Sequence, residues 1–358
     1  MRSTPALLLI GFSLLPAGAR CEARELALTL DSSTPGVTLA ATLRLPEGDG
    51  IRHAALLLPV AGPTDRDLSV GDRGIYRAAA EILAAEGIAT LRLADRGVDG
   101  SRGDWRNTSF ADRLADAVAA LGQLAARPEL SGACTGLVGM SEGGALALAA
   151  SSAAPGVAFV VALSPPMESG AVTLRGQRER LLAASPAPDA VKEELRAASE
   201  VLLAAVAAGD EGGVRRVLAG PLGPMLLLPY GFVPRELEER IAFVLSPWYR
   251  SQVAYDPGPL VAAARGPVLA VFGELDQVID ARRSADLLRQ ALAQTAPSSH
   301  RVELRPQRNH LLMPAVTGSP AEYGTLPEVV DRDLWREMAG WVREVCGEQG
   351  AGTASGRR

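Results

Sequence analysis

The stretch GLVGMSEGG, residues 136–144, decides the fold, because an apolar run ends there at a serine enclosed by glycines. The residues before the serine are predicted to form a buried strand, and those after it a helix. Gly139 and Gly143 flank Ser141 in the pattern G-x-S-x-G, a sharp turn that exposes a nucleophilic serine. Glycine is needed beside such a turn because neighbouring backbone segments approach closely. The stretch therefore predicts a nucleophile elbow, with Ser141 as the nucleophile.

Strand-like and helix-like segments alternate along most of the chain, which is typical of a mostly parallel central sheet flanked by helices. An opening hairpin is predicted at 25–29 and 37–45. The later strands are predicted at residues 54–60, 88–93, 135–140, 157–163, 268–272 and 301–304, and the main helices at 71–86, from Ser109 onward, at 142–152 and at 334–345.

The strand pattern stops between residues 165 and 259, where an amphipathic helix and turns rich in proline and glycine follow. We therefore expect a helical lid insertion at 165–259 in an α/β core formed by 24–164 and 260–346. The small, polar end, 347–358, is expected to be disordered. Apolar residues of the insertion, 225–228 and Phe232, are expected to pack on the sheet, with contact to a lipid surface as the alternative.

A catalytic serine needs a base, which is usually a histidine oriented by a carboxylate. The chain has three histidines. His53 begins a predicted strand and His300 precedes the last one, so both are expected at the end of the sheet opposite Ser141. His310 follows the last strand and is therefore the candidate base.

The acid is expected in the loop after the strand at 268–272, which supplies Glu274, Asp276 and Asp280. Asp276 is the candidate because Ser141, Asp276 and His310 follow the chain order nucleophile, acid, base. The other two carboxylates are interpreted as solvated loop charges.

Acyl transfer also requires donors for an oxyanion. The backbone N–H of Glu142, the residue after the nucleophile, is one candidate donor. The second is expected in the loop after the strand at 54–60, at Ala61 and Gly62, where small residues let the main chain approach a ligand. The side chain of Glu142 is expected to be structural or to lie at the rim of the pocket.

Several segments resemble the α/β-hydrolase superfamily, and within it a bacterial esterase-like branch related to the prolyl-oligopeptidase and dienelactone-hydrolase groups. The resemblance implies the α/β-hydrolase fold, a Ser-His-Asp triad and a helical lid. Val60, Ala61 and Gly62 stand where the branch has Gly-Ser-Gly, which affects the second oxyanion donor. The segments are GPTDRD (62–67), LRLADRGVDGS (91–101), SPWYRSQVAYDPGP (246–259), PVLAVFGELDQV (267–278) and NHLLMPAVTGSPAEYG (309–324).

These features predict a serine hydrolase that cleaves carboxylic esters of a small acyl substrate without a metal or cofactor. A serine peptidase or a thioesterase is the alternative, because the same triad serves all three reactions. A binding protein without catalysis is a further alternative. The net charge of −5 offers no broad basic surface, so a nucleic-acid partner is not expected.

The N-terminus resembles an export signal, with Arg2, an apolar run and small residues at 17–19. We expect a signal peptide at 1–19, with cleavage as late as 23 as the alternative, and a periplasmic or extracellular protein without membrane contact. Of the three cysteines, Cys134 and Cys346 lie beyond both cleavage sites and are expected to be free buried thiols, with oxidation to a disulfide in an exported protein as the alternative.

Overall fold

The computed structural model describes residues 24–230, 234–295 and 300–354. The expected signal peptide, whether it ends at 19 or at 23, lies outside the described residues, as do Phe232 and residues 355–358. Among the described residues, no helix combines the length and the apolar composition that crossing a bilayer requires.

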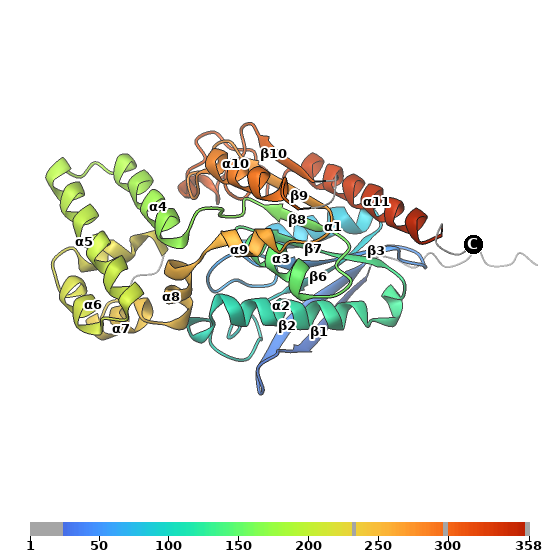
Figure 1. Ribbon diagram of the computed structural model, residues 1–358, viewed down its shortest axis with the longest axis horizontal. Helices are drawn as coiled ribbons and strands as arrows, with labels where there is room; N and C mark the ends of the chain where they lie inside the picture. Colours follow the sequence, from blue (N-terminus) through green and yellow to red (C-terminus); the bar gives the residue numbers. More distant parts are fainter. Residues whose placement is uncertain (1–23, 231–233, 296–299, 355–358) are drawn as a thin grey trace, which may run out of the picture.

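Within the described residues, an eight-stranded sheet has the order β1-β2-β6-β3-β7-β8-β9-β10 (Figure 1). β2 runs antiparallel to β1 and β6, whereas the pairs from β6 to β10 are parallel. The carboxyl ends of the parallel strands therefore meet at one edge. The strands are β1 (Arg24–Asp31), β2 (Thr38–Leu45), β3 (His53–Leu58), β6 (Ile88–Leu93), β7 (Cys134–Met140), β8 (Val160–Leu163), β9 (Val268–Gly273) and β10 (Arg301–Arg305).

Helices cover both faces of the sheet, which explains why β3, β7 and β9 are continuous apolar runs with buried interiors. α1 (Ile75–Ala85) and α11 (Arg332–Ala354) contribute to the hydrophobic core on one face. The core on the other face includes side chains of α2 (Phe110–Ala125), α3 (Glu142–Ala153), α9 (Pro257–Ala262) and α10 (Ala281–Leu292). The structure thus has the predicted mostly parallel sheet between helices.

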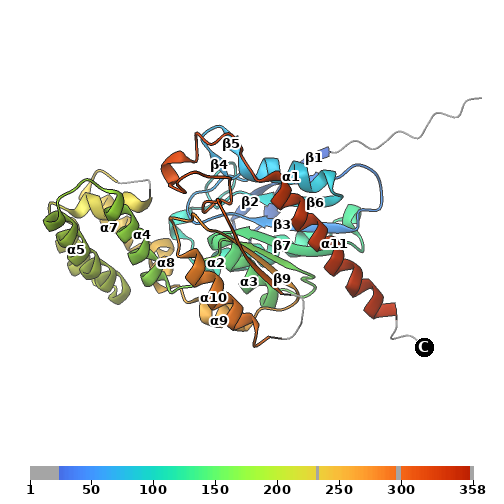
Figure 2. The same cartoon turned by 90° about the horizontal axis from the view of Figure 1, so that it is seen from above.

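The helical segments from residue 170 to residue 254, between β8 and α9, project from one end of this body, at the left in Figure 1 and again in Figure 2. Their buried side chains form a separate hydrophobic cluster that includes Leu202, Val206 and Leu218. We call this set the insertion. It consists of α4 (Gly170–Ala184), α5 (Asp189–Ala208), α6 (Glu211–Leu218), the 3₁₀ segment η3 (Gly223–Tyr230), α7 (Leu237–Val244) and α8 (Pro247–Ala254).

Three of the apolar residues at 225–228 pack differently from the prediction, and the side chain of the fourth, Leu228, lies outside the described part of the structure. Leu226 and Leu227 are fully buried in the hydrophobic cluster of the insertion and not on the sheet, while Met225 is exposed. The prediction that they pack on the sheet was wrong because helices α4 to α8 supply enough apolar surface to bury them.

Among the helices, two boundaries and one whole element differ from the sequence predictions. α1 begins at Ile75 and not at 71, because β4 (Ser69–Val70) and β5 (Arg73–Gly74) pair in a short hairpin. α10 was not predicted. α11, expected to end at Val345 before a disordered end, continues to Ala354.

Cys134 and Cys346 form a disulfide with a Cα–Cα distance of 6.0 Å, so the prediction of two free thiols was wrong. Cys134 begins β7 and Cys346 lies on α11. Their separation of 212 residues conceals the proximity, which arises because α11 packs on the sheet beside the start of β7. The bond fastens the last helix to the strand that leads to Ser141.

Candidate active site

Ser141 lies in the sharp turn between β7 and α3, at the carboxyl edge of the sheet. Its backbone has φ of 55° and ψ of −123°, in the left-handed half of φ space that residues with a side chain rarely adopt. The turn is held by the Ser141 N–H, which donates to the carbonyl of Leu163 at 2.7 Å. The Ser141 carbonyl accepts from the N–H of Gly144 at 2.9 Å. The serine therefore begins α3, whose N-terminal dipole favours negative charge.

The glycines of the elbow are required by space. A Cβ atom at Gly139 would lie 1.9 Å from the carbonyl oxygen of Gly143. A Cβ atom at Gly143 would lie 2.3 Å from the carbonyl oxygen of Leu58, at the end of β3. Both distances are shorter than a van der Waals contact, so only glycine lets α3 come this close to the neighbouring strand.

Asp276 and His310 come from the loops after β9 and β10, and the structure joins them. Nδ1 of His310 lies 2.7 Å from Oδ2 of Asp276, and both side chains are buried. The other carboxylate oxygen, Oδ1, accepts from the N–H groups of Val278 at 2.7 Å and Ile279 at 2.9 Å. The acid is thus fixed by its own loop, and the imidazole keeps Nε2 available for proton transfer.

The loop that carries His310 is shaped by its neighbour Asn309. The buried Asn309 Oδ1 accepts from the N–H groups of Leu311 and Met313, each at 3.0 Å. Leu312 has φ of 56°, so the chain turns tightly just after the histidine. This turn holds His310 in the wall of the site.

A cavity of about 570 Å³ lies between the elbow and the insertion, within the size range of small-molecule sites. Ser141 and His310 line it, and so do Ala61 and Gly62 of the loop after β3. The structure therefore brings the predicted nucleophile, base and oxyanion loop to one space. The insertion closes the cavity with side chains from α4, α7 and α8, among them Leu174, Gln177, Phe243, Trp248 and Gln252.

One wall of this cavity is aromatic. Trp105, on the short 3₁₀ helix η1 (Trp105–Asn107), contacts Trp248 edge-on with ring centroids 5.2 Å apart. Phe243 lies 6.3 Å from Trp105 and 5.8 Å from Trp248, measured between centroids. The guanidinium of Arg106 lies over the Trp105 ring at 4.8 Å. Core and insertion thus build this wall together.

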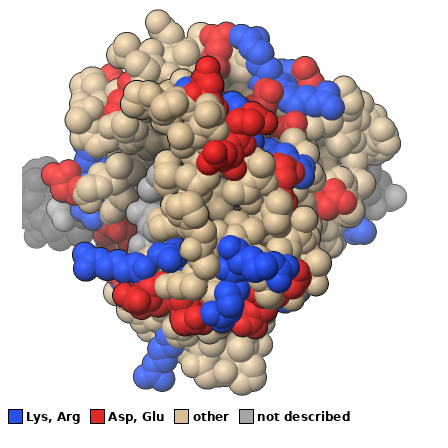
Figure 3. Space-filling model, turned by 90° about the vertical axis from the view of Figure 1, so that its left-hand side faces the viewer, with Lys and Arg blue, Asp and Glu red and all other residues tan. Residues whose placement is uncertain are grey.

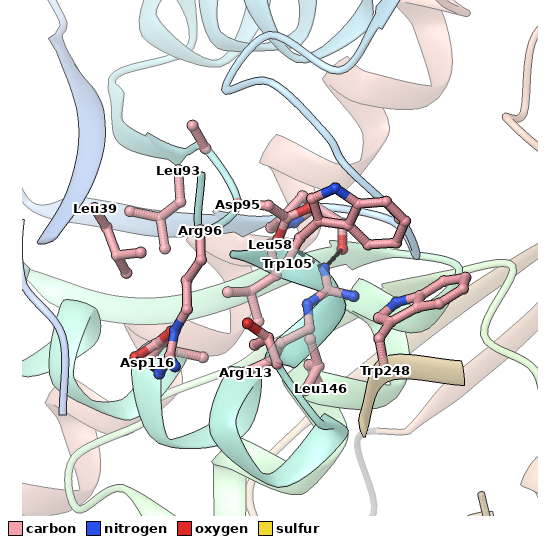
Figure 4. A pocket seen from close by; sticks show the side chains of 15 residues that line it. Leu39, Leu58, Leu93, Asp95, Arg96, Trp105, Arg113, Asp116, Leu146 and Trp248 are labelled. Carbon is pink, nitrogen blue, oxygen red and sulfur yellow. Dashed lines mark hydrogen bonds and ion pairs between the residues drawn. The ribbon is translucent and has the colours of Figure 1, made fainter. Parts of the chain in front are cut away.

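A buried ionic cluster joins Glu142, the residue after Ser141, to Arg113 and Asp95, and Figure 4 shows the last two side chains. Arg113 of α2 lies 3.2 Å from the carboxylate of Asp95, which follows β6, and forms an ion pair with Glu142. Burial raises the pKa of Asp95 to about 6, although the charge of Arg113 opposes the shift. Burial also disfavours the charged form of Arg113, but the carboxylates of Asp95 and Glu142 outweigh it and hold its pKa above the ordinary value. The side chain of Glu142 is thus buried in an ion pair, in agreement with the structural role expected for it.

The sequence interpretation overlooked Arg113 and Asp95. α2 follows Ser109, as predicted, and Ser109 forms a capping box with Asp112. The buried face of α2, however, includes two charged residues, Arg113 and Asp116. Both can be buried because Arg113 pairs with Asp95 and Asp116 pairs with Arg96. Apolar periodicity contains no signal for such pairs.

The other histidines and carboxylates that the sequence offered as candidates are not among the residues that line this cavity. His53 begins β3, and His300 precedes β10, where its Nε2 is 3.0 Å from the Thr295 hydroxyl. Glu274 pairs with Arg282 at the surface. Asp280 caps α10 by accepting the N–H of Arg283 at 2.9 Å, so it is a helix cap and not a free loop charge.

The chain matches no protein-family model and no curated protein sequence. Solved structures do share its architecture. An esterase from Pyrococcus furiosus is similar at 13% identity and a TM-score of 0.56, over 90% of this chain and 92% of that one. A hypothetical protein from Pseudomonas aeruginosa is similar at 19% identity and a TM-score of 0.56, over 94% and 99%.

A third similar structure is an α/β hydrolase from Penicillium sp. sh18, at 18% identity and a TM-score of 0.54, over 91% of this chain and 99% of that one. Identities this low describe a shared architecture and not a shared reaction. Together with the strand order and the elbow, they show that the chain has the α/β-hydrolase fold.

Proposed function

We propose that the chain is an exported serine hydrolase that cleaves carboxylic esters through Ser141, His310 and Asp276. One observation carries the proposal. The hydrogen-bonded pair of Asp276 and His310 opens on the same cavity as Ser141, whose backbone is held at positive φ. A nucleophile, a base and an orienting acid are what acyl transfer by serine requires.

The proposed reaction has two steps. Ser141 Oγ attacks the acyl carbonyl while Nε2 of His310 takes its proton, and Asp276 keeps the imidazole in the tautomer that accepts at Nε2. Main-chain N–H groups of Glu142 and of the loop at Ala61 and Gly62 stabilise the oxyanion. The alcohol leaves with the proton from His310. Water, deprotonated in turn by His310, then releases the acid.

Two observations support an ester that carries an apolar group. The cavity is walled by Trp105, Phe243 and Trp248, which suits an apolar acyl or alkyl group. One of the solved structures with this fold is an esterase. A peptidase or a thioesterase remains the alternative, and comparison of kcat/KM for matched ester, amide and thioester substrates separates the three.

Export is supported by the sequence of the N-terminus and by the disulfide between Cys134 and Cys346. Structural disulfides form and persist in oxidising compartments, such as the periplasm and the extracellular space. The substrate is therefore proposed to be a small acyl ester met outside the cytoplasm.

Replacement of the nucleophile tests the proposed reaction. Ser141→Ala should lower kcat for a short-chain p-nitrophenyl ester by at least about 10⁴-fold, because no other group can form the acyl-enzyme. Labelling by a fluorophosphonate probe should also disappear, while the circular dichroism spectrum stays unchanged.

Ser152→Ala is the matched control. Ser152 lies on the same helix, α3, but its hydroxyl donates to the carbonyl of Ala149 at 2.9 Å. This variant should retain full turnover and labelling. Undiminished turnover by Ser141→Ala would remove Ser141 from the reaction, and absence of both turnover and labelling in the native protein would favour a binding protein.

A further inference from the structure

Arg113 contacts both segments that form the proposed oxyanion hole. One guanidinium nitrogen donates to the carbonyl of Val60 at 2.8 Å and to that of Pro59 at 3.3 Å, in the loop after β3. Another forms the ion pair with the side chain of Glu142, whose backbone N–H is the other proposed donor. A single buried cation therefore joins the two sides of the hole.

The loop after β3 is held a second time by the partner of Arg113. Asp95 Oδ2 accepts the N–H of Thr64 at 3.0 Å, and the Asp95 N–H donates to the Thr64 carbonyl at 3.0 Å. Between these anchors the chain passes through Gly62, with φ of 102°. The Arg113–Asp95 pair thus fixes both ends of the segment 59–64, which contains Ala61 and Gly62.

The same cluster reaches the insertion. Gln252 of α8 donates from Nε2 to Oε1 of Glu142 at 2.8 Å, and it also lines the cavity. Next to it, the Ser251 hydroxyl accepts the N–H of Phe110, the first residue of α2, at 3.1 Å. Arg113, Trp105 and Trp248 line a small pocket together, and Figure 4 shows the guanidinium of Arg113 near both tryptophan rings.

From these contacts we infer that Arg113 is a positioning residue, which sets the distance between the two oxyanion donors and ties both to α8 of the insertion. The inference rests on the proposed hydrolase function. It assigns Arg113 no contact with the substrate. Its effect passes through the loop at 59–64 and through Glu142.

The chemistry of the side chain explains why an arginine occupies this position. Guanidinium has five N–H donors in a rigid plane, and here it meets two carboxylates and two backbone carbonyls at once. A lysine has three donors on one atom and cannot span these acceptors. Donors of an oxyanion hole act only when they lie close to the position of the developing charge. A small displacement of the loop should therefore slow the chemical step more than it weakens substrate binding.

The test compares Arg113→Lys and Arg113→Met with the native enzyme on a short-chain p-nitrophenyl ester. Active sites are counted by the end point of fluorophosphonate labelling, so that misfolded protein does not enter kcat. We expect kcat per labelled site to fall about 100-fold in Arg113→Met and about 10-fold in Arg113→Lys, with KM within about threefold of the native value. Should Arg113→Met fail to fold, Glu142→Gln breaks the same ion pair and should lower kcat about 10-fold.

Arg96→Lys is the matched control. Arg96 is buried like Arg113 and pairs with a carboxylate, Asp116, at 2.6 Å. Its other side-chain partners are Ser32 and Thr34, so its described hydrogen bonds do not involve the elbow or the segment 59–64. This variant should keep kcat per labelled site within about twofold. An equal fall in Arg96→Lys would overturn the inference, as would a native kcat in Arg113→Lys.

A second measurement does not depend on turnover. The N–H of Thr64 should exchange with solvent deuterium at least about 10-fold faster in Arg113→Lys than in the native protein and in Arg96→Lys, because the loop loses its anchor. If the native chain shows no ester turnover, the proposed function fails while this arm still decides the inference. Unchanged exchange at Thr64 would then overturn it.

Discussion

The core and the insertion contribute to the candidate site in different ways. In the core, Ser141, Asp276 and His310 each follow a parallel strand, so the sheet fixes where the loops begin. The insertion contributes helices with a hydrophobic cluster of their own and supplies walls of the cavity. The three groups proposed to react thus depend on the sheet for their positions, and the shape of the cavity depends on the helices of the insertion.

Charges show the same difference. The core buries ion pairs, such as Arg113 with Glu142 and Arg96 with Asp116, where no side chain is more than 8% exposed. In the insertion, Arg215 pairs with Glu238 at the surface, where their side chains are 42% and 70% exposed. Figure 3 shows acidic and basic residues interspersed over the insertion end of the molecule. We therefore expect the same type of substitution to change stability and turnover differently in the core and in the insertion.

The largest difference is expected for glycine replacements in helices. Gly143→Ala places a methyl group 2.3 Å from the Leu58 carbonyl and 2.6 Å from that of Pro59, so α3 or the oxyanion loop must move. We expect a loss of about 3 kcal/mol in the free energy of unfolding and a fall in kcat of about 100-fold or more. Chemical denaturation and ester turnover measure the two effects.

Gly212→Ala is the counterpart in α6 of the insertion. A methyl group there meets its neighbours, in Arg216 and Asp210, at an ordinary 3.4 Å. Alanine favours a helix over glycine, so stability should rise by about 0.5 to 1 kcal/mol with unchanged turnover. If Gly143→Ala and Gly212→Ala lowered the free energy of unfolding by similar amounts, the close packing at the elbow would not distinguish the core from the insertion.

The disulfide provides the next test, because both cysteines belong to the core. The double variant Cys134→Ala, Cys346→Ala should lower the free energy of unfolding by about 2 to 4 kcal/mol, since a long loop is released in the unfolded chain. Removal of the disulfide should accelerate amide hydrogen exchange in α11 and β7 much more than in α5 of the insertion. In the native protein with its disulfide intact, neither cysteine should react with a thiol reagent unless a reductant is added. Equal acceleration in α5 would show that the two regions unfold as one unit.

The core could be predicted in some detail because its signals are local. The motif of the elbow at Ser141 consists of consecutive residues, and each buried strand is an apolar run. Chain order and the edge at which parallel strands end singled out Asp276 and His310, which lie within hydrogen-bond distance of each other. These inferences needed no knowledge of contacts between distant segments.

The features that sequence could not supply depend on such contacts. Cys134 and Cys346 are 212 residues apart and meet only through the docking of α11. In the sequence, nothing distinguishes Arg113 from an exposed charged residue of a helix. Its burial depends on Asp95 and Glu142, which pair with it only in the folded chain. The apolar residues at 225–228 could cover either the sheet or the insertion, because burial alone does not name a partner. Polar pairs and separate hydrophobic clusters are properties of the folded chain.

Single carboxylates provide the last test, because the stabilities of the two regions should respond to pH in opposite directions. Burial raises the pKa of Asp95 from 3.8 to about 6, so the folded protein binds this proton more tightly than the unfolded chain. The cost of burying the charge is fully present above pH 6 and disappears as the pH falls towards 4. The stability of the native protein relative to Asp95→Asn should therefore rise by about 2 to 3 kcal/mol between pH 7 and pH 4.

Glu238→Gln makes the same chemical change in the insertion. The hydrogen bond from Arg215 lowers the pKa of Glu238, so this carboxylate stabilises the folded state at neutral pH and loses that contribution as the pH falls through its pKa. The native protein should thus lose a little stability relative to Glu238→Gln on acidification, because water screens an exposed pair. Denaturation of both variants and the native chain at pH 4, 5, 6 and 7 gives the two slopes. Slopes of the same sign would mean that Asp95 is not buried as a charged group. The contrast between the buried ion pairs around Arg113 in the core and the exposed pair of Arg215 and Glu238 in the insertion would then fail.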